Sequence, residues 1–152
     1  MTTGSLLDQM KVKVYNYNPS IVFIELGSVD LKNDESLKKI RDNYGLIIDS
    51  IKMNRPNAVI VIEAVYPINR NYTKALNYDF TNDDINSLND SLRSLAIEKN
   101  VQYFDAYSLL SKNNELNSLY TNDGVHLNDR GYSVLYDNII KIIGWWIWKI
   151  RL

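Results

Sequence analysis

Short apolar runs alternate with longer amphipathic stretches along the middle of this chain, and this alternation constrains the fold more than any other feature. The run IVFIEL at 21–26 lies between a proline and a glycine, which is typical of a buried strand. Similar runs follow at 58–65 (AVIVIEAV) and 101–106 (VQYFDA). Between them, apolar residues recur at helical spacing over 35–53 and 85–96. The pattern predicts the order strand, helix, strand, helix, strand.

Polar residues before each predicted helix indicate where it begins. Asn33 or Asp34 is placed to cap the first helix, and one of residues 81–83 to cap the second. Helices that link one strand to the next are the crossover connections that parallel strands need, and they cover the faces of the sheet. We therefore expect an α/β fold, a three-layer α/β/α sandwich with a parallel sheet.

Three loops are expected to surround any ligand site, because ligands of open parallel sheets bind beyond the carboxyl ends of the strands. They are 27–34 (GSVDLKND), 66–71 (YPINRN) and the segment from the third strand to DGVHL at 123–127.

The chain has 152 residues, and a chain of about 150 residues buries roughly 68–70% of its unfolded surface. We expect one domain over residues 1–152.

Composition excludes several classes of function. The 17 Lys and Arg residues nearly balance 18 Asp and Glu residues and are scattered, so nucleic acid is not an expected partner. The chain has no cysteine, which excludes disulfides, thiolate metal sites and a cysteine nucleophile. No glycine-rich phosphate loop follows a predicted strand, so a nucleotide is not expected, and no cofactor is predicted.

Neither end of the sequence predicts a membrane segment. The first ten residues lack the charged and apolar regions of a signal peptide, so we expect a cytoplasmic protein. Residues 139–152 (IIKIIGWWIWKIRL) are apolar and aromatic but interrupted by charges, whereas a spanning helix needs about 20 mostly apolar residues. They predict a helix that packs one face on the core. Its three tryptophans leave a second interpretation open, an oligomer or membrane-interface contact.

The only histidine, His126, follows Asp123 by three residues in TNDGVHLNDRGY at 121–132. A neutral imidazole can act as a general base near neutral pH, and a carboxylate that accepts its other N–H fixes its tautomer. The pair is therefore a candidate base and acid, although such pairs also occur as surface or capping contacts. Both side chains could instead join Asp30 and Asp34 around Mg or Mn. These residues have no regular ligand spacing, so no metal site is predicted.

Two stretches resemble sequence blocks of the GDSL or SGNH hydrolases, a family of serine esterases, lipases and acylhydrolases. IVFIELGSVDLKND at 21–34 is similar to the third block and YTNDGVHLNDRGY at 120–132 to the fifth. The resemblance extends from Thr2 to about Ile140. It implies the flavodoxin-like SGNH fold and hydrolysis of a small-molecule ester. It also implies that Asp123 and His126 are the acid and base of a Ser-His-Asp triad.

The third block departs from the family pattern at one position. Gly27 and Asp30 match the glycine and aspartate of the Gly-x-Asn-Asp block, but Val29 replaces its asparagine. In the family this asparagine helps to form the oxyanion hole, and losing one such donor costs on the order of 100- to 1000-fold in rate. Asn33, four residues further on, and Ser28 are the other candidates to line the site.

The family's Gly-Asp-Ser block, which carries the nucleophile after the first strand, has no counterpart here. TTGSLLDQM at 2–10 resembles the start of a later helix, so we expect the N-terminal strands to be missing. Ser5 is interpreted as a helix-start residue. Ser28, at the carboxyl end of a predicted strand, is better placed but is only a weak candidate for a substitute nucleophile. Strand 21–26 would then have a bare edge, which predicts self-association through that edge or through the Trp-rich C-terminus.

Two hypotheses follow. The first is an ester-hydrolysing enzyme of the SGNH type, of which this chain provides the acid and the base. The second is a noncatalytic remnant of the fold that binds a ligand or partner without turnover.

Overall fold

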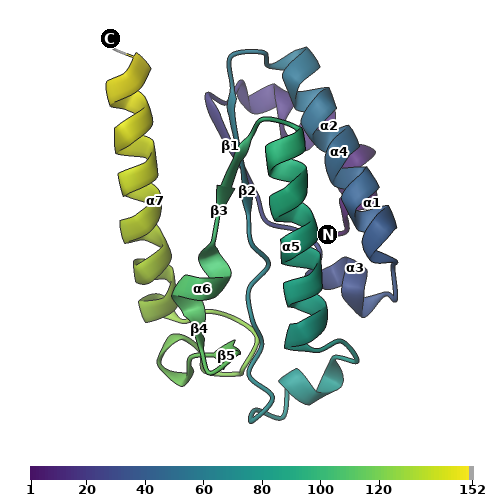
Figure 1. The fold of residues 1–152 in the computed structure, drawn as a ribbon, viewed down its shortest axis with the longest axis vertical. Coiled ribbons are helices and arrows are strands. Elements are labelled where there is room, and N and C mark those ends of the chain that lie inside the picture. The colour runs from purple at the N-terminus through teal and green to yellow at the C-terminus, as the bar shows by residue number, and fades with distance from the viewer. Residues whose placement is uncertain (151–152) are drawn as a thin grey trace. The chain divides into compact units, whose positions relative to one another are not determined.

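The computed structural model describes residues 1–150, and side chains as far as residue 144, and contains a parallel three-stranded sheet (Figure 1). Its order is β1 (Ile21–Ile24), β2 (Val59–Glu63), β3 (Gln102–Phe104). Ile24 lies opposite Ile62, which lies opposite Tyr103. The predicted α/β class with a parallel sheet is confirmed, and all three strands lie within the predicted runs.

The chain divides into two compact units. The first comprises Met1–Val65 and Tyr78–Asp105, and the second comprises Tyr66–Asn77 and the chain from Ala106 onward. The single domain over residues 1–152 stays a prediction.

The first unit contains the sheet and most of the helices. They are α1 (Thr3–Leu7), α2 (Met10–Lys13), the 3-10 helix η1 (Tyr15–Tyr17), α3 (Ser28–Lys32), α4 (Leu37–Asn54) and α5 (Asn82–Glu98). The two long helices are the predicted crossovers and pack against each other. Their apolar stripes form the core, in which these side chains are fully buried: Ile40, Tyr44, Ile47, Ile48, Ile51, Ile85, Leu88 and Leu92.

The start of α4 differs from the prediction. Ser36, not Asn33 or Asp34, is its cap, and the Ser36 hydroxyl accepts the Lys39 N–H at 3.3 Å. The reason is the additional helix α3, which forms where a loop was predicted and ends at Asn33. The cap of α5 is confirmed: Thr81 and Asp84 accept each other's backbone N–H groups in a reciprocal capping box.

The second unit is built from shorter elements and one long helix. They are the 3-10 helices η2 (Ala75–Asn77) and η3 (Ser118–Tyr120), the helix α6 (Ala106–Leu110), the antiparallel strands β4 (Ser111–Lys112) and β5 (Glu115–Leu116), and α7 (Asp129–Ile150). The predicted C-terminal helix is confirmed, but Trp145, Trp146 and Trp148 lie outside the described side chains, and so does their predicted contact.

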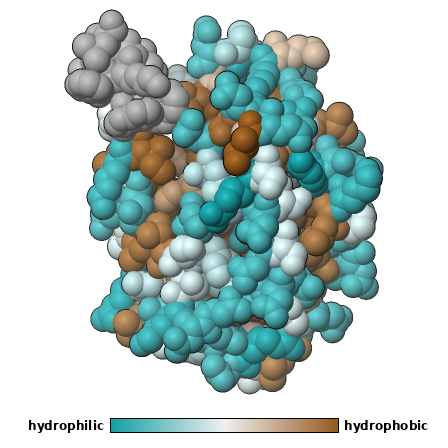
Figure 2. All heavy atoms as spheres, viewed as in Figure 1, coloured by the Kyte–Doolittle hydropathy of each residue, from teal (hydrophilic) through white to brown (hydrophobic). Residues whose placement is uncertain are grey.

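No helix in the described part of the chain is both long and apolar enough to cross a membrane. On the face that Figure 2 shows, apolar residues lie in separate patches among hydrophilic ones.

Candidate active site

Hydrogen bonds of Thr121 hold together the loop that carries the candidate acid and base. The buried Thr121 hydroxyl donates to the carbonyl of His126 at 2.8 Å and accepts the N–H groups of Asp123 at 3.2 Å and Gly124 at 2.8 Å. Thr121 also pairs with Leu127 in an antiparallel bridge. Thr121 therefore fixes both ends of the turn, independently of the side chains of Asp123 and His126.

Gly124 is required at the tip of this turn. Its φ is +81°, a conformation that other residues rarely adopt. A Cβ there would also lie 2.6 Å from both the Asn69 carbonyl oxygen and the Tyr72 Cβ. The Gly124 carbonyl accepts the Asn69 N–H at 2.8 Å. The glycine thus lets the segment after β2 pass directly against the turn.

Gly131, in the same motif, is needed because neighbouring atoms leave no room for a side chain there. A Cβ at this position would lie 2.9 Å from the Tyr120 carbonyl oxygen and 3.1 Å from Leu127. Asn128 precedes α7 and its side-chain oxygen accepts the N–H groups of Arg130 at 3.0 Å and Gly131 at 3.2 Å. The sequence after the histidine therefore begins the long helix directly behind the turn.

The turn aims the carboxylate of Asp123 at the imidazole of His126. Oδ1 accepts the backbone N–H groups of Val125 at 2.9 Å and His126 at 2.7 Å. With Oδ1 held in this way, Oδ2 lies 2.8 Å from Nδ1 of His126. The His126 side chain is 64% exposed, and Nε2 forms no hydrogen bond with any described residue. An Nδ1–H that donates to Asp123 leaves Nε2 as a free base that faces solvent.

Lys74 is a third member of this cluster. Its Nζ lies 2.9 Å from Oδ2 of Asp123 and 3.3 Å from Nδ1 of His126. Desolvation raises the pKa of Asp123, but the hydrogen bonds from Lys74, His126 and Val125 outweigh it and hold this pKa well below its usual range. The carboxylate is therefore ionised throughout the pH range in which a histidine titrates. Sequence reasoning missed Lys74, which lies in a loop without a recognisable pattern.

The other candidate site residues follow β1 in the first unit. Gly27 has a φ of +128°, and a Cβ there would lie 2.7 Å from Leu88 and 3.2 Å from Val65. Ser28 is the half-buried first residue of α3, and Val29 is 37% exposed. Asn33, at the end of α3, is exposed. Asp123 and His126 belong to the second unit.

Asp30 is buried and already bonded. Both of its carboxylate oxygens lie 3.0 Å from the Thr3 N–H, and Oδ1 accepts the Thr3 hydroxyl at 2.6 Å. Asn43 on α4 donates to the same hydroxyl at 2.9 Å. The contacts tie the first turn of α1 to α3 and α4, which gives Asp30 a clear part in holding the fold.

Ser5 is the third residue of α1, as its interpretation as a helix-start residue predicts. Its hydroxyl donates to the Thr2 carbonyl at 2.9 Å and accepts the Thr2 N–H at 3.0 Å.

Among the residues that the structure describes, no three His, Asp or Glu side chains gather in a way that could hold a metal ion.

The sequence matches the profile of the GDSL-like lipase/acylhydrolase family over residues 1–134. Since the match covers most of the chain, the protein belongs to this family, as the resemblance of the two blocks predicted. No curated protein matches the chain.

Solved structures match the fold closely. A candidate platelet activating factor from Streptococcus pneumonia is 25% identical with a TM-score of 0.87, and the match covers 93% of this chain and 68% of that one. A GDSL-like lipase from Bacteroides thetaiotaomicron is 23% identical with a TM-score of 0.82, covering 95% and 71%. A catalytic mutant of an acetylxylan esterase from Geobacillus stearothermophilus is 16% identical with a TM-score of 0.74, covering 95% and 68%. The latter two support the fold alone.

Proposed function

We propose that this chain provides the base and the acid of a Ser-His-Asp hydrolase that acts on carboxylic esters. The observation that carries the proposal is the turn in which backbone N–H groups fix one oxygen of Asp123 while the other meets Nδ1 of His126 at 2.8 Å. Membership of the GDSL-like lipase/acylhydrolase family supports the hydrolase class. The acyl group and the alcohol of the ester are left open.

In the proposed reaction Nε2 of His126 removes the proton of a serine hydroxyl while the serine oxygen attacks the ester carbonyl. The imidazolium that forms is stabilised by Asp123 and returns the proton to the departing alcohol, which leaves an acyl-serine. Water then attacks the acyl-serine while His126 takes a proton from it, and the imidazolium returns that proton to the serine oxygen as the carboxylic acid leaves. The strongly acidic pKa of Asp123 keeps its charge available in every step.

The serine in this proposal comes from polypeptide outside the 152 residues. No hydroxyl among the described residues is hydrogen-bonded to Nε2 of His126, and the Ser5 hydroxyl is used in the cap of α1. The catalytic mutant of the acetylxylan esterase carries alanine in place of a serine. The solved relatives are also longer than this chain, which matches 68% to 71% of their length.

A noncatalytic role is the second candidate, and Val29 is the residue that favours it. Its side chain has no N–H or O–H group, and the resemblance places it where the family has an asparagine that helps to bind the oxyanion. A chain that binds a ligand or partner without turnover would keep the fold while losing this donor.

The first test is hydrolysis of p-nitrophenyl acetate by the purified chain beside His126→Ala. We expect equal rates for the two proteins, and no covalent adduct by intact-mass spectrometry after treatment with a serine-directed fluorophosphonate. An adduct would overturn the external serine, and peptide mapping with Ser5→Ala and Ser28→Ala would then identify the nucleophile.

The second test joins the chain to the part of the Streptococcus pneumonia relative that the match does not cover. We expect this chimaera to hydrolyse the ester and to lose at least 100-fold in rate with His126→Ala. A stable, folded chimaera that is inactive, or one that is insensitive to His126→Ala, would refute the esterase and favour the noncatalytic role. Tyr132→Phe, at an exposed position, is the matched control.

A further inference from the structure

Lys74 and His126 share one acceptor, the Oδ2 atom of Asp123. Nζ of Lys74 lies 2.9 Å from this oxygen, and Nδ1 of His126 lies 2.8 Å from it. The two nitrogens are 3.3 Å apart, so each is closer to Oδ2 than to the other. This is the geometry of two donors that converge on one acceptor. The imidazole therefore meets a negative and a positive charge at similar distances.

The backbone around Lys74 is held against the same turn. Ala75, the next residue, is fully buried, and its N–H donates to the Tyr72 carbonyl at 3.0 Å. The Tyr72 N–H donates to the Asn69 carbonyl at 3.2 Å, and the Asn69 N–H donates to the Gly124 carbonyl at 2.8 Å. All of these residues belong to the second unit. Lys74 is thus anchored to the turn through its own backbone as well as through its ammonium group.

The charges beside the imidazole act on its protonation in opposite directions. Among the residues that the structure describes, Asp123 and Lys74 are the charged groups that contact the ring. The carboxylate attracts the positive charge that protonation places on the ring, and the ammonium repels it. The side chains of Lys74 and His126 are 49% and 64% exposed, so water weakens both effects. Each is then expected to move the protonation of the ring by about one pH unit.

A general base has to be unprotonated before its reaction begins. An imidazole beside a carboxylate alone keeps its proton up to a higher pH, which leaves less of the base form at neutral and mildly acidic pH. We propose that Lys74 is a positioning residue that acts through Asp123 and His126: its ammonium keeps the imidazole unprotonated in this pH range, while Asp123 still orients the ring. This assignment rests on the proposed function, in which Nε2 of His126 takes the proton of a serine hydroxyl.

The single histidine of the chain allows a direct test. Diethyl pyrocarbonate modifies an unprotonated imidazole, and the ultraviolet absorbance of the product follows the modification of His126 alone. Rate constants measured between pH 5 and pH 8 on the full 152-residue chain give the pH of half-maximal modification. We expect Lys74→Met, which removes the charge and keeps a side chain of similar length, to raise this midpoint by about one pH unit.

Two further variants are the controls. Lys74→Arg keeps the charge and should leave the midpoint within about 0.3 pH unit of that of the unsubstituted chain. Lys38→Met is the matched control, because Lys38 on α4 of the first unit also forms an exposed ion pair, with Asp42 at 2.6 Å. It should not move the midpoint. Circular dichroism melts check that the variants fold, and Lys74→Gln, with the same expected shift, replaces Lys74→Met if that variant does not.

The direction of the shift separates this part from a merely structural one. If Lys74 only held the carboxylate in place, Lys74→Met would release Asp123 from the ring and lower the midpoint. A lowered or unchanged midpoint would therefore overturn the proposal. Equal shifts for Lys74→Met and Lys74→Arg would also overturn it, because the charge would then have no part in the effect.

The chimaera with the Streptococcus pneumonia segment distinguishes this proposal from the esterase. Lys74→Met should move the acid limb of its ester hydrolysis to higher pH by the same amount as the midpoint of modification. A folded but inactive chimaera would refute the esterase, and the midpoint would still decide whether Lys74 sets the protonation of His126. An active chimaera whose acid limb does not move would overturn only the part assigned to Lys74.

Discussion

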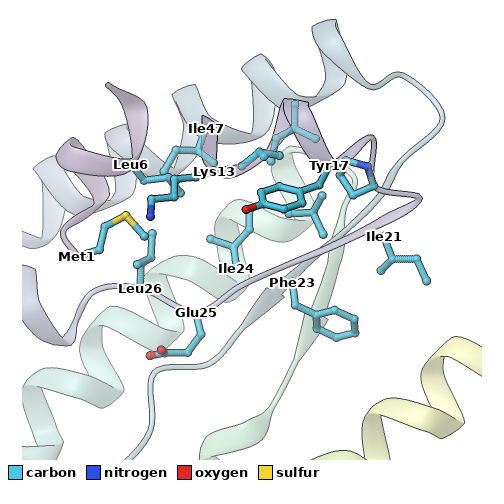
Figure 3. Close-up of a pocket in the computed structure, with 14 residues that line it drawn as sticks. Met1, Leu6, Lys13, Tyr17, Ile21, Phe23, Ile24, Glu25, Leu26 and Ile47 are labelled. Carbon is cyan, nitrogen blue, oxygen red and sulfur yellow. The ribbon is translucent and has the colours of Figure 1, made fainter. Parts of the chain in front are cut away.

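Glu25 is the side chain whose replacement should most change the pH dependence of stability. It directly follows β1, and the register that places Ile24 opposite Ile62 brings Glu25 beside Glu63. Burial, and after it the charge of Glu63, raise the pKa of Glu25 (Figure 3) from its ordinary value of 4.5 to about 7, while the N-terminal amine opposes the shift. The nearby Tyr44 hydroxyl is bonded to the backbone of Leu26.

The sign of the effect follows from which state holds the proton. Between pH 4.5 and about 7 the folded chain keeps a proton on Glu25 that the unfolded chain has released. Stability therefore falls as the pH rises through this window and is lowest above pH 7. A shift of this size corresponds to roughly 3 kcal/mol at most, and relaxation around the carboxylate pair reduces it.

Glu25→Gln removes the charge and nearly keeps the shape. We expect the free energy of unfolding to rise by about 1 to 3 kcal/mol at pH 8 and to change little at pH 4.5. Urea unfolding followed by circular dichroism at pH 4.5, 6, 7 and 8 measures this difference. Glu35→Gln, at an exposed position, is the control and should change the free energy of unfolding by the same amount at all four pH values. Parallel pH profiles for Glu25→Gln and the unsubstituted chain would refute the reasoning.

Three further substitutions test individual contacts. Lys74→Met should raise the pKa of Asp123 toward its usual range, which titration of the carboxyl carbon by NMR measures; an unchanged pKa would contradict the part assigned to Lys74. Gly124→Ala forces a left-handed residue against a neighbouring carbonyl and should cost about 1 to 3 kcal/mol in urea unfolding. Asp30→Asn weakens the bonds to Thr3 and should cost a similar amount, about 1 to 3 kcal/mol, with no loss if these bonds are unimportant.

The strands and the long helices were predictable because their signals are local and repeat. Four or five consecutive apolar residues identify β1 and β2, and the helical spacing of buried residues identifies α4 and α5. The helix α3 was not predicted, because only two residues of SVDLK, Asp30 and Leu31, are buried, and only Leu31 of these two is apolar. Five residues are too few for a periodic pattern, and the cap of α4 was misplaced as a consequence.

The parts of the candidate site also differ in whether a local sequence signal predicts them. Asp123 and His126 are three residues apart, so one turn brings them together and the sequence predicts the contact. Lys74 is 49 residues from Asp123 and reaches it only because the loop after β2 packs on Gly124. Asp30 is the reverse case: the resemblance marks it as a site residue, while its bonds to Thr3, 27 residues away, are visible only in the structure.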